Sequence, residues 1–423
     1  MSAVKVLIVN VHSTFNAGDR ALLECTIQQI QENFSDVEIK ISANWPEEDY
    51  FESCGFSVTP SFTALTGQGR KTTASHQILS ALEGWWRTRP SPRKPGPDML
   101  GKWSKIVDGY DWADLVVGVA GNQFHSSGRF SWPFLLMCMS VKLAHDYGKP
   151  FYTMPQSIGP FQHKWEKQLM SSLYRRGKII FLRDQVSIEL AKAIGIGEMA
   201  AFAPDPAFAY LPAEPSKGLQ ILVEHGYDPS QSSVGVTVLP ELGKAVRKEN
   251  ISNYYSVLAS ALGRLMDQRG VHLFFFNQVT GFSALEDDRF GIQQILERLD
   301  GQKEKIHWVN RSLSPAELKA CYGWMDLFIP ARLHSGIFAL GMYVPALFIG
   351  YLTKTRGILQ SMDLGEWMVQ IEELNPEILW VKMQEAWDNR QQNAALLRKI
   401  LPPVIEAAKI PGTRIAQNYE GRR

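Results

Sequence analysis

The stretch Asp326-Leu-Phe-Ile-Pro-Ala-Arg-Leu-His-Ser-Gly-Ile-Phe-Ala-Leu-Gly341 changes character in its middle. Residues 326–330 form a short apolar run, typical of a buried parallel strand, and residues 334–342 are apolar with small residues, which predicts a helix. The polar side chains fall between the two, at the carboxyl end of the strand. A strand followed at once by a helix is the repeating unit of doubly wound α/β proteins.

The same alternation forms two series along the chain. In the first series we expect strands at residues 4–11, 37–42, 114–120, 150–154 and 178–183, and helices at 20–33, 132–147, 163–175 and 185–194. In the second we expect strands at 233–239, 271–277, 305–309, 326–330 and 346–350, and helices at 253–269, 288–299, 314–324 and 334–342. Two such series predict an α/β fold of two doubly wound, Rossmann-like domains that face a cleft.

The expected domain limits follow from composition. We place the N-terminal domain at residues 1–215 and the C-terminal domain at 216–370, with the Pro-, Ala- and Gly-rich residues 204–230 as the linker. Residues 371–423 predict two amphipathic C-terminal helices, at 376–390 and 393–408. By analogy with other two-domain clefts, a terminal helix would brace the N-terminal domain.

Composition excludes several classes of protein. The 423 residues include 44 Lys and Arg and 43 Asp and Glu, and this balance disfavours a nucleic-acid-binding protein. The four cysteines form no CxxC or Cys/His cluster, so we expect buried, reduced thiols, no metal and no disulfide framework. Residues 1–11 are typical of a buried strand and not of a signal sequence, and no apolar run is long enough to cross a membrane. We therefore expect a cytoplasmic protein, with contact to the inner face of the membrane as a further hypothesis.

One segment, residues 66–105, departs from the βα pattern. It is rich in Pro and Trp, and it carries two acidic and eight basic residues, the latter being Arg70, Lys71, Arg87, Arg89, Arg93, Lys94, Lys102 and Lys105. A solvated surface insertion is the simpler interpretation. The alternative is that Trp85 and Trp86, with neighbouring arginines, contact an anionic, lipid-linked acceptor at a membrane surface.

Polar or glycine-rich loops follow several strands of the first series. Asn16-Ala-Gly18-Asp19 precedes a helix, so Asp19 is either a helix N-cap, which the spacing favours, or a carboxylate that faces the cleft. The loop 118–125 holds Asn122 and Gln123, and the loop 155–161 holds Gln156. Because the carboxyl ends of parallel strands share one edge, these groups are expected at the rim of one cleft, although structural turns explain each loop equally well.

Arg183-Asp184 closes another predicted strand, and Asp205 stands between two prolines. A local salt bridge is a sufficient explanation for the first motif. A tight interdomain turn is a sufficient explanation for the second. Either motif is equally suited to presenting a charged group to a ligand.

The strongest motif is the one quoted first. Arg332 ends a buried strand, and Leu333, His334 and Ser335 begin the following helix. A guanidinium recognises carboxylate or phosphate, a helix N-terminus favours an anion, and an imidazole transfers protons near neutral pH. Lys354 follows the next strand, so the pattern predicts a site for an anion.

Taken in order, Asn16-x-Gly18-Asp19, Gln156-Ser-Ile-Gly159-Pro160, Arg183-Asp184, Asp205-Pro206 and Arg332-Leu-His334-Ser-Gly336, with Pro345 and Lys354, resemble the polysaccharide pyruvyltransferase family over residues 4–365. The resemblance implies a fold similar to two-domain GT-B glycosyltransferases. It also implies transfer of the enolpyruvyl group of phosphoenolpyruvate to two hydroxyls of a sugar, which gives a cyclic ketal and phosphate.

The resemblance assigns roles to these residues. His334 would be the general acid, and Asp19 would accept the proton of the sugar hydroxyl. Arg183 and Arg332, with the backbone at Leu333 and Ser335, would hold the substrate anion. Lys354, Asn16, Gly18, Asn122, Gln123 and Gln156 complete the predicted substrate-binding set. The expected partners are phosphoenolpyruvate, as a substrate and not a cofactor, and a sugar or lipid-linked oligosaccharide; the oligomeric state is left open.

Two alternatives remain at this point. A GT-B glycosyltransferase would use the same cations and helix amides for the diphosphate of a nucleotide-sugar. A non-catalytic sugar-binding protein on the same fold would not need converging Arg, His and Lys side chains.

Overall fold

A computed structural model describes residues 3–45, 49–62, 64, 103–126, 131–240, 248–281, 286–299, 303–350 and 353–421. The predicted insertion at 66–105 therefore lies almost wholly outside the described residues. The chain divides into two compact units. Unit 1 comprises residues 1–14, 22–206 and 408–423, and unit 2 comprises residues 15–21 and 207–407. The main division thus falls between Pro206 and Ala207, whereas the sequence suggested 215/216.

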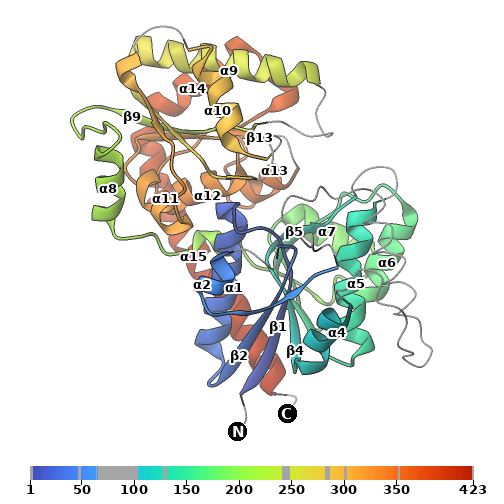
Figure 1. Ribbon diagram of the computed structural model, residues 1–423. Coiled ribbons are helices and arrows are strands. Elements are labelled where there is room, and N and C mark those ends of the chain that lie inside the picture. The colour runs from blue at the N-terminus through green and yellow to red at the C-terminus, as the bar shows by residue number, and fades with distance from the viewer. Residues whose placement is uncertain are drawn as a thin grey trace. The chain divides into compact units, whose positions relative to one another are not determined.

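Unit 1 is built on a parallel sheet (Figure 1). The strand order is β3-β2-β1-β4-β6-β7-β8, and β5 pairs with β6 beside this path. The strands are β1 (Val4–Val11), β2 (Val37–Ala43), β3 (Ser57–Pro60), β4 (Leu115–Gly118), β5 (Gly121–Phe124), β6 (Phe151–Ile158), β7 (Ile180–Leu182) and β8 (Ala200–Phe202). Both β1 and β6 are almost entirely buried, which is why their sequences, VKVLIVNV and FYTMPQSI, do not alternate regularly between apolar and polar residues.

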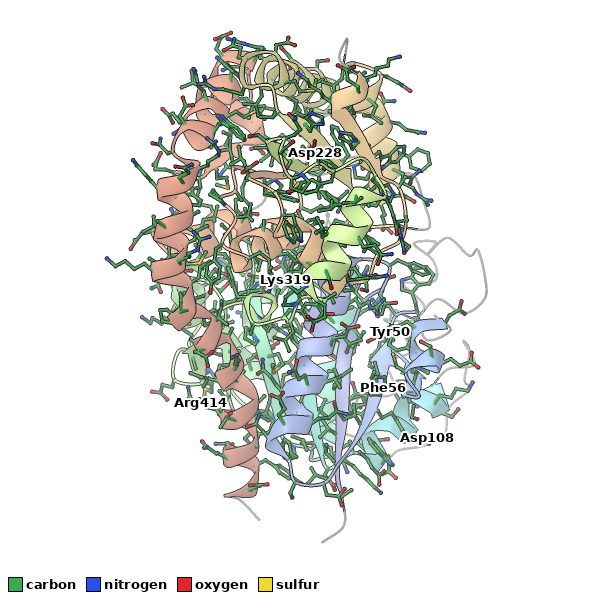
Figure 2. All side chains as sticks on the ribbon, turned by 90° about the vertical axis from the view of Figure 1, so that its left-hand side faces the viewer. Tyr50, Phe56, Asp108, Asp228, Lys319 and Arg414 are labelled. Carbon is green, nitrogen blue, oxygen red and sulfur yellow. The ribbon has the colours of Figure 1, made fainter. Side chains whose placement is uncertain are left out.

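Helices cover both faces of this sheet. They are α1 (Ala17–Asn33), α2 (Asp49–Ser53), α4 (Trp103–Trp112), α5 (Trp132–Asp146), α6 (Lys164–Tyr174), α7 (Gln185–Ala193) and the end of α15 (Arg390–Glu420). The side chain of Gln29 on α1 ties α15 down, because it donates to the Ala408 carbonyl at 2.9 Å and accepts from the Gly412 amide at 3.0 Å. Arg414 lies on α15 (Figure 2), and its Cζ is 5.5 Å from the ring centre of Phe181. The first turn of α1 and the first half of α15 are counted in unit 2.

Unit 2 has a parallel sheet of order β11-β10-β9-β12 and a separate pair β13-β14. The strands are β9 (Ser233–Thr237), β10 (His272–Phe276), β11 (Ile306–Val309), β12 (Leu327–Pro330), β13 (Phe348–Gly350) and β14 (Met368–Gln370). A single bridge between Phe328 and Ala346 connects the chain entering β13 to β12. Every strand pairing in the two sheets and in the β13-β14 pair is parallel. The predicted α/β class of two doubly wound, Rossmann-like units is thereby confirmed.

The unit 2 helices are η1 (Pro206–Phe208), α8 (Pro215–Val223), α9 (Lys248–Arg269), α10 (Asp288–Leu296), η3 (Lys303–Lys305), α11 (Pro315–Tyr322), α12 (Leu333–Gly341), α13 (Thr353–Gln360), η4 (Ile371–Glu373) and α14 (Pro376–Asp388). Helix α14 packs against α9 within unit 2 (Figure 1). Lys319 is a buried residue of α11 (Figure 2). It donates to the carbonyls of Ala207, Phe208 and Tyr210 at 3.2, 3.1 and 2.6 Å. This side chain therefore holds residues 207–210, at the start of unit 2, against helix α11.

Three local predictions were wrong. Residues 204–230 are not a plain linker, because α8 forms within them and packs on α11, where Gly218 leaves no room for a Cβ beside Ala320. The loop 118–125 includes the short strand β5. Cys54 is exposed, whereas Cys25, Cys138 and Cys321 are buried as expected. In the first two cases tertiary packing overrode a composition rich in turn-forming residues.

Candidate active site

The carboxyl edge of the unit 2 sheet gathers the polar residues that follow its strands. Gln278 and Val279 come after β10, and Arg332 and His334 come after β12. β10 and β12 both pair with β9 in parallel, so these residues emerge at the same edge. In doubly wound sheets this edge is where ligands bind.

A segment from the beginning of the chain joins this edge. Asn16 forms an antiparallel bridge with Val279, the Ala17 amide donates to the Gln278 carbonyl at 3.0 Å, and the Thr280 amide donates to Phe15 at 3.0 Å. The first turn of α1 is thus part of unit 2 although it lies more than 250 residues upstream in sequence. This juxtaposition brings Asn16, Gly18 and Asp19 to the edge that carries His334.

Asn16 is the residue that caps α1. Its Oδ1 accepts from the amides of Gly18 at 2.9 Å and Asp19 at 3.4 Å, and its Nδ2 donates to Asp19 Oδ2 at 3.0 Å. The prediction that Asp19 is the N-cap was therefore wrong. Asp19 lies in the first helical turn, with a half-buried carboxylate that Asn16 orients.

The imidazole of His334 lies directly on the backbone of Gly18. A Cβ at position 18 would come within 2.2 Å of His334 Nδ1 and 2.5 Å of its Cγ. Such distances do not occur between non-bonded atoms, so only glycine fits here unless the ring moves. His334 is half-buried and occupies the second position of α12.

Arg332 is held by a carboxylate that the sequence did not single out. Its Nε and Nη2 donate to Asp288 Oδ1 at 3.0 and 2.7 Å, and Nη2 also donates to the Glu286 carbonyl at 3.1 Å. Asp288 Oδ2 accepts from the amides of Gln278 and Val279, each at 2.9 Å. The only signal in the sequence was an acidic residue at the start of an expected helix, which is more often a helix-dipole contact than a site residue.

Asp288 is fully buried, and this burial raises the pKa of its carboxyl above the ordinary value, against the opposing effect of Arg332. The guanidinium side chain keeps 20% of its surface exposed, while the carboxylate has none. Asp288 therefore positions Arg332 at the edge of the sheet, where part of the guanidinium still faces solvent.

The first turn of α12 supplies backbone donors at the same place. Arg332 precedes the helix and makes no side-chain cap, so the amides of residues 333–335 lie at a helix start with no intrahelical acceptor. Ser335 is buried; its Oγ donates to the Arg332 carbonyl at 2.7 Å and lies 2.7 Å from Thr237 Oγ1. Leu333 and Lys354 are half-buried, and Lys354 lies on α13, which follows β13.

The other predicted site residues belong to unit 1. Gln156 is fully buried in β6 and donates to the Val119 carbonyl at 2.9 Å. Gln123 donates to the Ala120 carbonyl at 3.1 Å, and both it and Asn122 are half-buried in β5. Their roles as substrate ligands remain predictions.

Arg183 also lies in unit 1, in a sealed network. It pairs with Asp205, and its Nε donates to Ser157 Oγ at 3.0 Å. Ser157 in turn donates to Asp184 at 2.7 Å, and Asp184 caps α7 through the Ser187 amide at 2.8 Å. The ion pair is thus with Asp205 across the βα connection and not the local one between Arg183 and Asp184.

In the described part of the chain, no group of three or more His, Cys, Asp or Glu side chains has an arrangement that would hold a metal ion. No helix in that part combines the length and the apolar character that a membrane span needs.

Comparison with known sequences identifies a family. The profile described as "Polysaccharide pyruvyl transferase" matches residues 16–353. The chain is also 22% identical to the amylovoran biosynthesis protein AmsJ of Erwinia amylovora, over 97% of this chain and 98% of that protein.

Comparison with solved structures concerns the fold. A UDP-GlcNAc 2-epimerase from Neisseria meningitidis, bound to UDP-GlcNAc, superposes with a TM-score of 0.58 at 10% identity, covering 97% of this chain and 98% of that one. Anabaena HepE in complex with UDP-glucose superposes with a TM-score of 0.59 at 11% identity, covering 99% and 100%. At such low identity these likenesses establish a shared fold and nothing more.

Proposed function

Because the chain belongs to the polysaccharide pyruvyl transferase family, we propose that it transfers the enolpyruvyl group of phosphoenolpyruvate to two hydroxyls of a sugar in an exopolysaccharide or its precursor. The products are a cyclic pyruvate ketal and inorganic phosphate. Family membership makes the chain a transferase of polysaccharide biosynthesis. The donor and the ketal are the parts that we propose.

The single observation that carries the proposal is the gathering of Asn16, Gly18 and Asp19 against Arg332 and His334 at one sheet edge. A proton donor, a carboxylate, a fixed guanidinium and a helix N-terminus are the groups that this chemistry needs. Sugar binding alone needs none of the charged ones.

The first step is protonation of the methylene carbon of phosphoenolpyruvate, which makes its neighbouring carbon electrophilic. We assign the proton to His334, because the ring is fixed against Gly18 and a neutral-pH acid is required. A sugar hydroxyl then adds to the electrophilic carbon. Asp19, held by Asn16, accepts the proton that this hydroxyl loses.

The second step breaks the bond between this carbon and the phosphate oxygen, and the bond's electron pair leaves with the phosphate. A second sugar hydroxyl then adds to the carbon and closes the ketal ring, and its proton goes to the departing phosphate. Arg332, fixed by Asp288, and the amides of residues 333–335 favour the charge that develops on the departing phosphate. Lys354 adds a positive side chain after β13. Arg183, Asn122, Gln123 and Gln156 remain proposed contacts, the buried Arg183 through the network with Ser157 and Asp205.

The decisive experiment supplies the purified protein with phosphoenolpyruvate and a panel of galactosides, glucosides and N-acetylhexosamines. We expect phosphate release together with a mass increase equal to one pyruvate ketal on the acceptor. Release of phosphate without that mass increase, or neither signal on any acceptor, contradicts the proposal.

The nucleotide-sugar alternative has a specific basis, because two proteins of similar fold were crystallised with UDP-sugars. Thermal stabilisation separates the two functions. We expect phosphoenolpyruvate to raise the Tm and UDP to leave it unchanged, and the reverse result favours a glycosyltransferase. A cytoplasmic location and a membrane contact of residues 66–105 stay predictions.

A further inference from the structure

Unit 2 contains a cavity of about 170 Å³ that is not part of the carboxyl edge. Its walls combine apolar residues with polar side chains. The apolar residues are Trp367, Pro345, Ala346, Leu347 and Ala386. A cavity of about 150 Å³ holds one benzene molecule, so this volume admits one face of a pyranose ring, and the open side of the cavity leaves room for its hydroxyls.

The cavity lies at the opposite end of the strands from His334. Ala346 pairs with Phe328 near the start of β12, and Trp367 immediately precedes β14. Arg332 is four residues beyond Phe328, which corresponds to about 13 Å along an extended strand. A ligand in this cavity would therefore leave the groups around His334 accessible.

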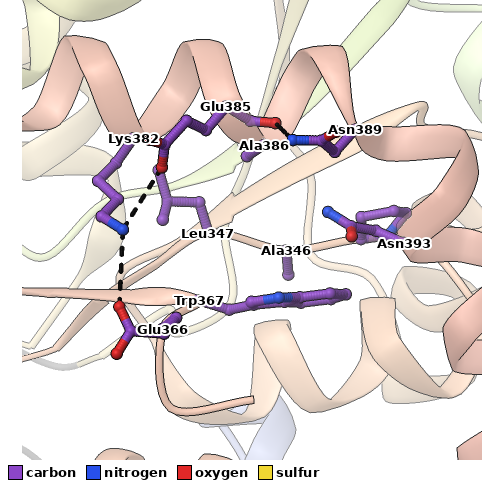
Figure 3. A pocket seen from close by; sticks show the side chains of 10 residues that line it. Ala346, Leu347, Glu366, Trp367, Lys382, Glu385, Ala386, Asn389 and Asn393 are labelled. Atoms are coloured by element: carbon purple, nitrogen blue, oxygen red, sulfur yellow. Dashed lines mark hydrogen bonds and ion pairs between the residues drawn. The ribbon is translucent and has the colours of Figure 1, made fainter.

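The indole of Trp367 forms one wall. Figure 3 shows it edge-on, with Ala346 and Asn393 on one side of its plane and Glu385 and Asn389 on the helical segment beyond. The backbone of Trp367 is fixed, because its carbonyl accepts from the Phe348 amide at 2.8 Å. A flat aromatic face next to amide side chains suits a sugar ring, whose axial C–H groups are apolar and whose rim carries hydroxyls.

The charged side chains around the cavity carry more negative than positive charge. Lys382 Nζ lies 3.7 Å from Glu366 and 3.4 Å from Glu385, so one ammonium stands between two carboxylates (Figure 3). The local balance is negative, which disfavours phosphoenolpyruvate, a nucleotide or a sugar that already carries a carboxylate. Neutral hydroxyls, in contrast, find a donor and an acceptor in Asn393. Asn389 Nδ2 donates to the Glu385 carbonyl at 2.9 Å, and its Oδ1 remains as an acceptor.

We propose that this cavity, the Trp367 pocket, binds one neutral hexose unit of the glycan acceptor. The ring stacks on the indole of Trp367, and its hydroxyls form hydrogen bonds with Asn389 and Asn393. Assigning this sugar to the acceptor rests on the proposed function. The pocket then retains a polymeric or oligosaccharide acceptor by a unit other than the one that reacts.

Binding is measured by saturation-transfer NMR on the full-length protein, without phosphoenolpyruvate. The probes are methyl β-D-glucopyranoside and methyl β-D-galactopyranoside, with glucose 6-phosphate as the anionic control. We expect saturation of the ring C–H protons of at least one neutral probe. Trp367→Ala should raise the Kd of this probe about tenfold, which is within the range that stacking of a nucleic-acid base on an aromatic side chain contributes. Asn393→Ala, which leaves the indole in place, should weaken binding less.

Two controls make the result specific. Trp165→Ala removes a partly exposed tryptophan of unit 1 and should leave binding unchanged. His334→Gln should also bind normally, because the pocket does not include it. Three results would overturn the proposed sugar site. They are an equal loss of affinity in Trp367→Ala and Trp165→Ala, no saturation of either neutral probe, and stronger binding of glucose 6-phosphate than of the neutral probes.

Turnover separates this inference from the proposed function. With an oligosaccharide acceptor, Trp367→Ala should raise KM about tenfold and leave kcat unchanged, while a monosaccharide acceptor should show no change in KM. An equal rise for both acceptors overturns the role in acceptor retention. If sugar binding depends on Trp367 but phosphoenolpyruvate is never consumed, the proposed function fails and the sugar site stands.

Discussion

Two Arg–Asp pairs follow parallel strands in this molecule, and they differ in enclosure. Arg183 and Asp205 in unit 1 have no exposed side-chain surface. Arg332 and Asp288 in unit 2 share the same chemistry, but the Arg332 side chain is 20% exposed while Asp288 is sealed. The two pairs are indistinguishable as residue types in sequence.

The difference in enclosure indicates which pair contributes to the stability of the fold and which pair can take part in the chemistry. In the fully enclosed pair, Arg183 Nε also donates to Ser157, which in turn donates to Asp184, whereas Nη2 has no hydrogen-bond partner. Removing one member of this pair leaves a buried charge. In the other pair only the carboxylate of Asp288 is fully buried, and it holds an Arg332 side chain that is still partly exposed to solvent. We therefore infer that the Arg183 pair contributes mainly to stability, in competition with its predicted role as a substrate contact, and that the edge with the Arg332 pair contributes to the chemistry.

The largest expected effect tests the assignment of chemistry to unit 2. His334→Gln keeps a polar side chain of similar reach but removes the acid, and kcat should fall about 10²- to 10⁴-fold. The Tm should stay nearly unchanged, because the residue is half-buried and lies at a helix start. Phosphate release and thermal unfolding measure the two quantities, and a variant that keeps most of its turnover would remove His334 from the mechanism.

The next effect tests the sealed pair. Arg183→Met leaves Asp205 charged and buried, and should lower the free energy of unfolding by about 3–5 kcal/mol. Lys142→Met, which breaks the partly exposed pair with Asp146 in the same unit, is the matched control and should cost less than about 1 kcal/mol. Denaturant unfolding measures both.

A double variant decides whether Arg183 also acts on substrate. Arg183→Met with Asp205→Leu removes both charges and should recover most of the lost stability. If the recovered protein has normal kcat and KM, Arg183 is structural. If it is stable but its KM for phosphoenolpyruvate rises, the predicted substrate contact is upheld and our comparison of the two pairs fails.

A smaller effect concerns the contact between Gly18 and His334. Gly18→Ala places a Cβ where the imidazole now lies, so the ring must shift, and a shift of about 1 Å can cost about 10²-fold in kcat. Gly263→Ala is the control, since its Cβ would meet only Leu299 at 3.9 Å. Unchanged turnover in Gly18→Ala would mean that the observed ring position is not the active one.

The sequence predicted the two βα series because buried parallel strands and their helices carry local apolar patterns. It also singled out Arg332 and His334, since polar residues directly after an apolar run are a local signal. It did not predict that Asp288 pairs with Arg332, or that the imidazole of His334 packs on Gly18, because both contacts join residues far apart in the chain. The enclosure of Arg183 was likewise invisible, since burial depends on what the rest of unit 1 packs over it.

The smallest effect contrasts the two ends of the unit 2 strands. At the amino end, His272 Nδ1 lies 2.9 Å from His307 Nε2, within hydrogen-bond distance. Burial lowers the pKa of both residues. The pKa of His272 is lowered further by Lys305, and Asp228 and Glu304 oppose this shift. The pKa of His307 is lowered further by the neighbouring His272. A lowered pKa in the folded state gives stability that is present above the ordinary value of 6.5 and is lost as pH falls through the folded value.

Thermal unfolding between pH 7.5 and 5.5 should therefore show the Tm of the wild type falling by a few degrees as pH decreases. His307→Gln keeps a hydrogen-bonding side chain but cannot be protonated, so its Tm should depend less on pH. The pH dependence of kcat should be the same in both proteins, because His272 and His307 lie at the amino end of β10 and β11 and His334 follows the carboxyl end of β12. A kcat profile that moves with His307→Gln would show that the two ends of the sheet are coupled, and the separation of stability from chemistry would not hold within unit 2.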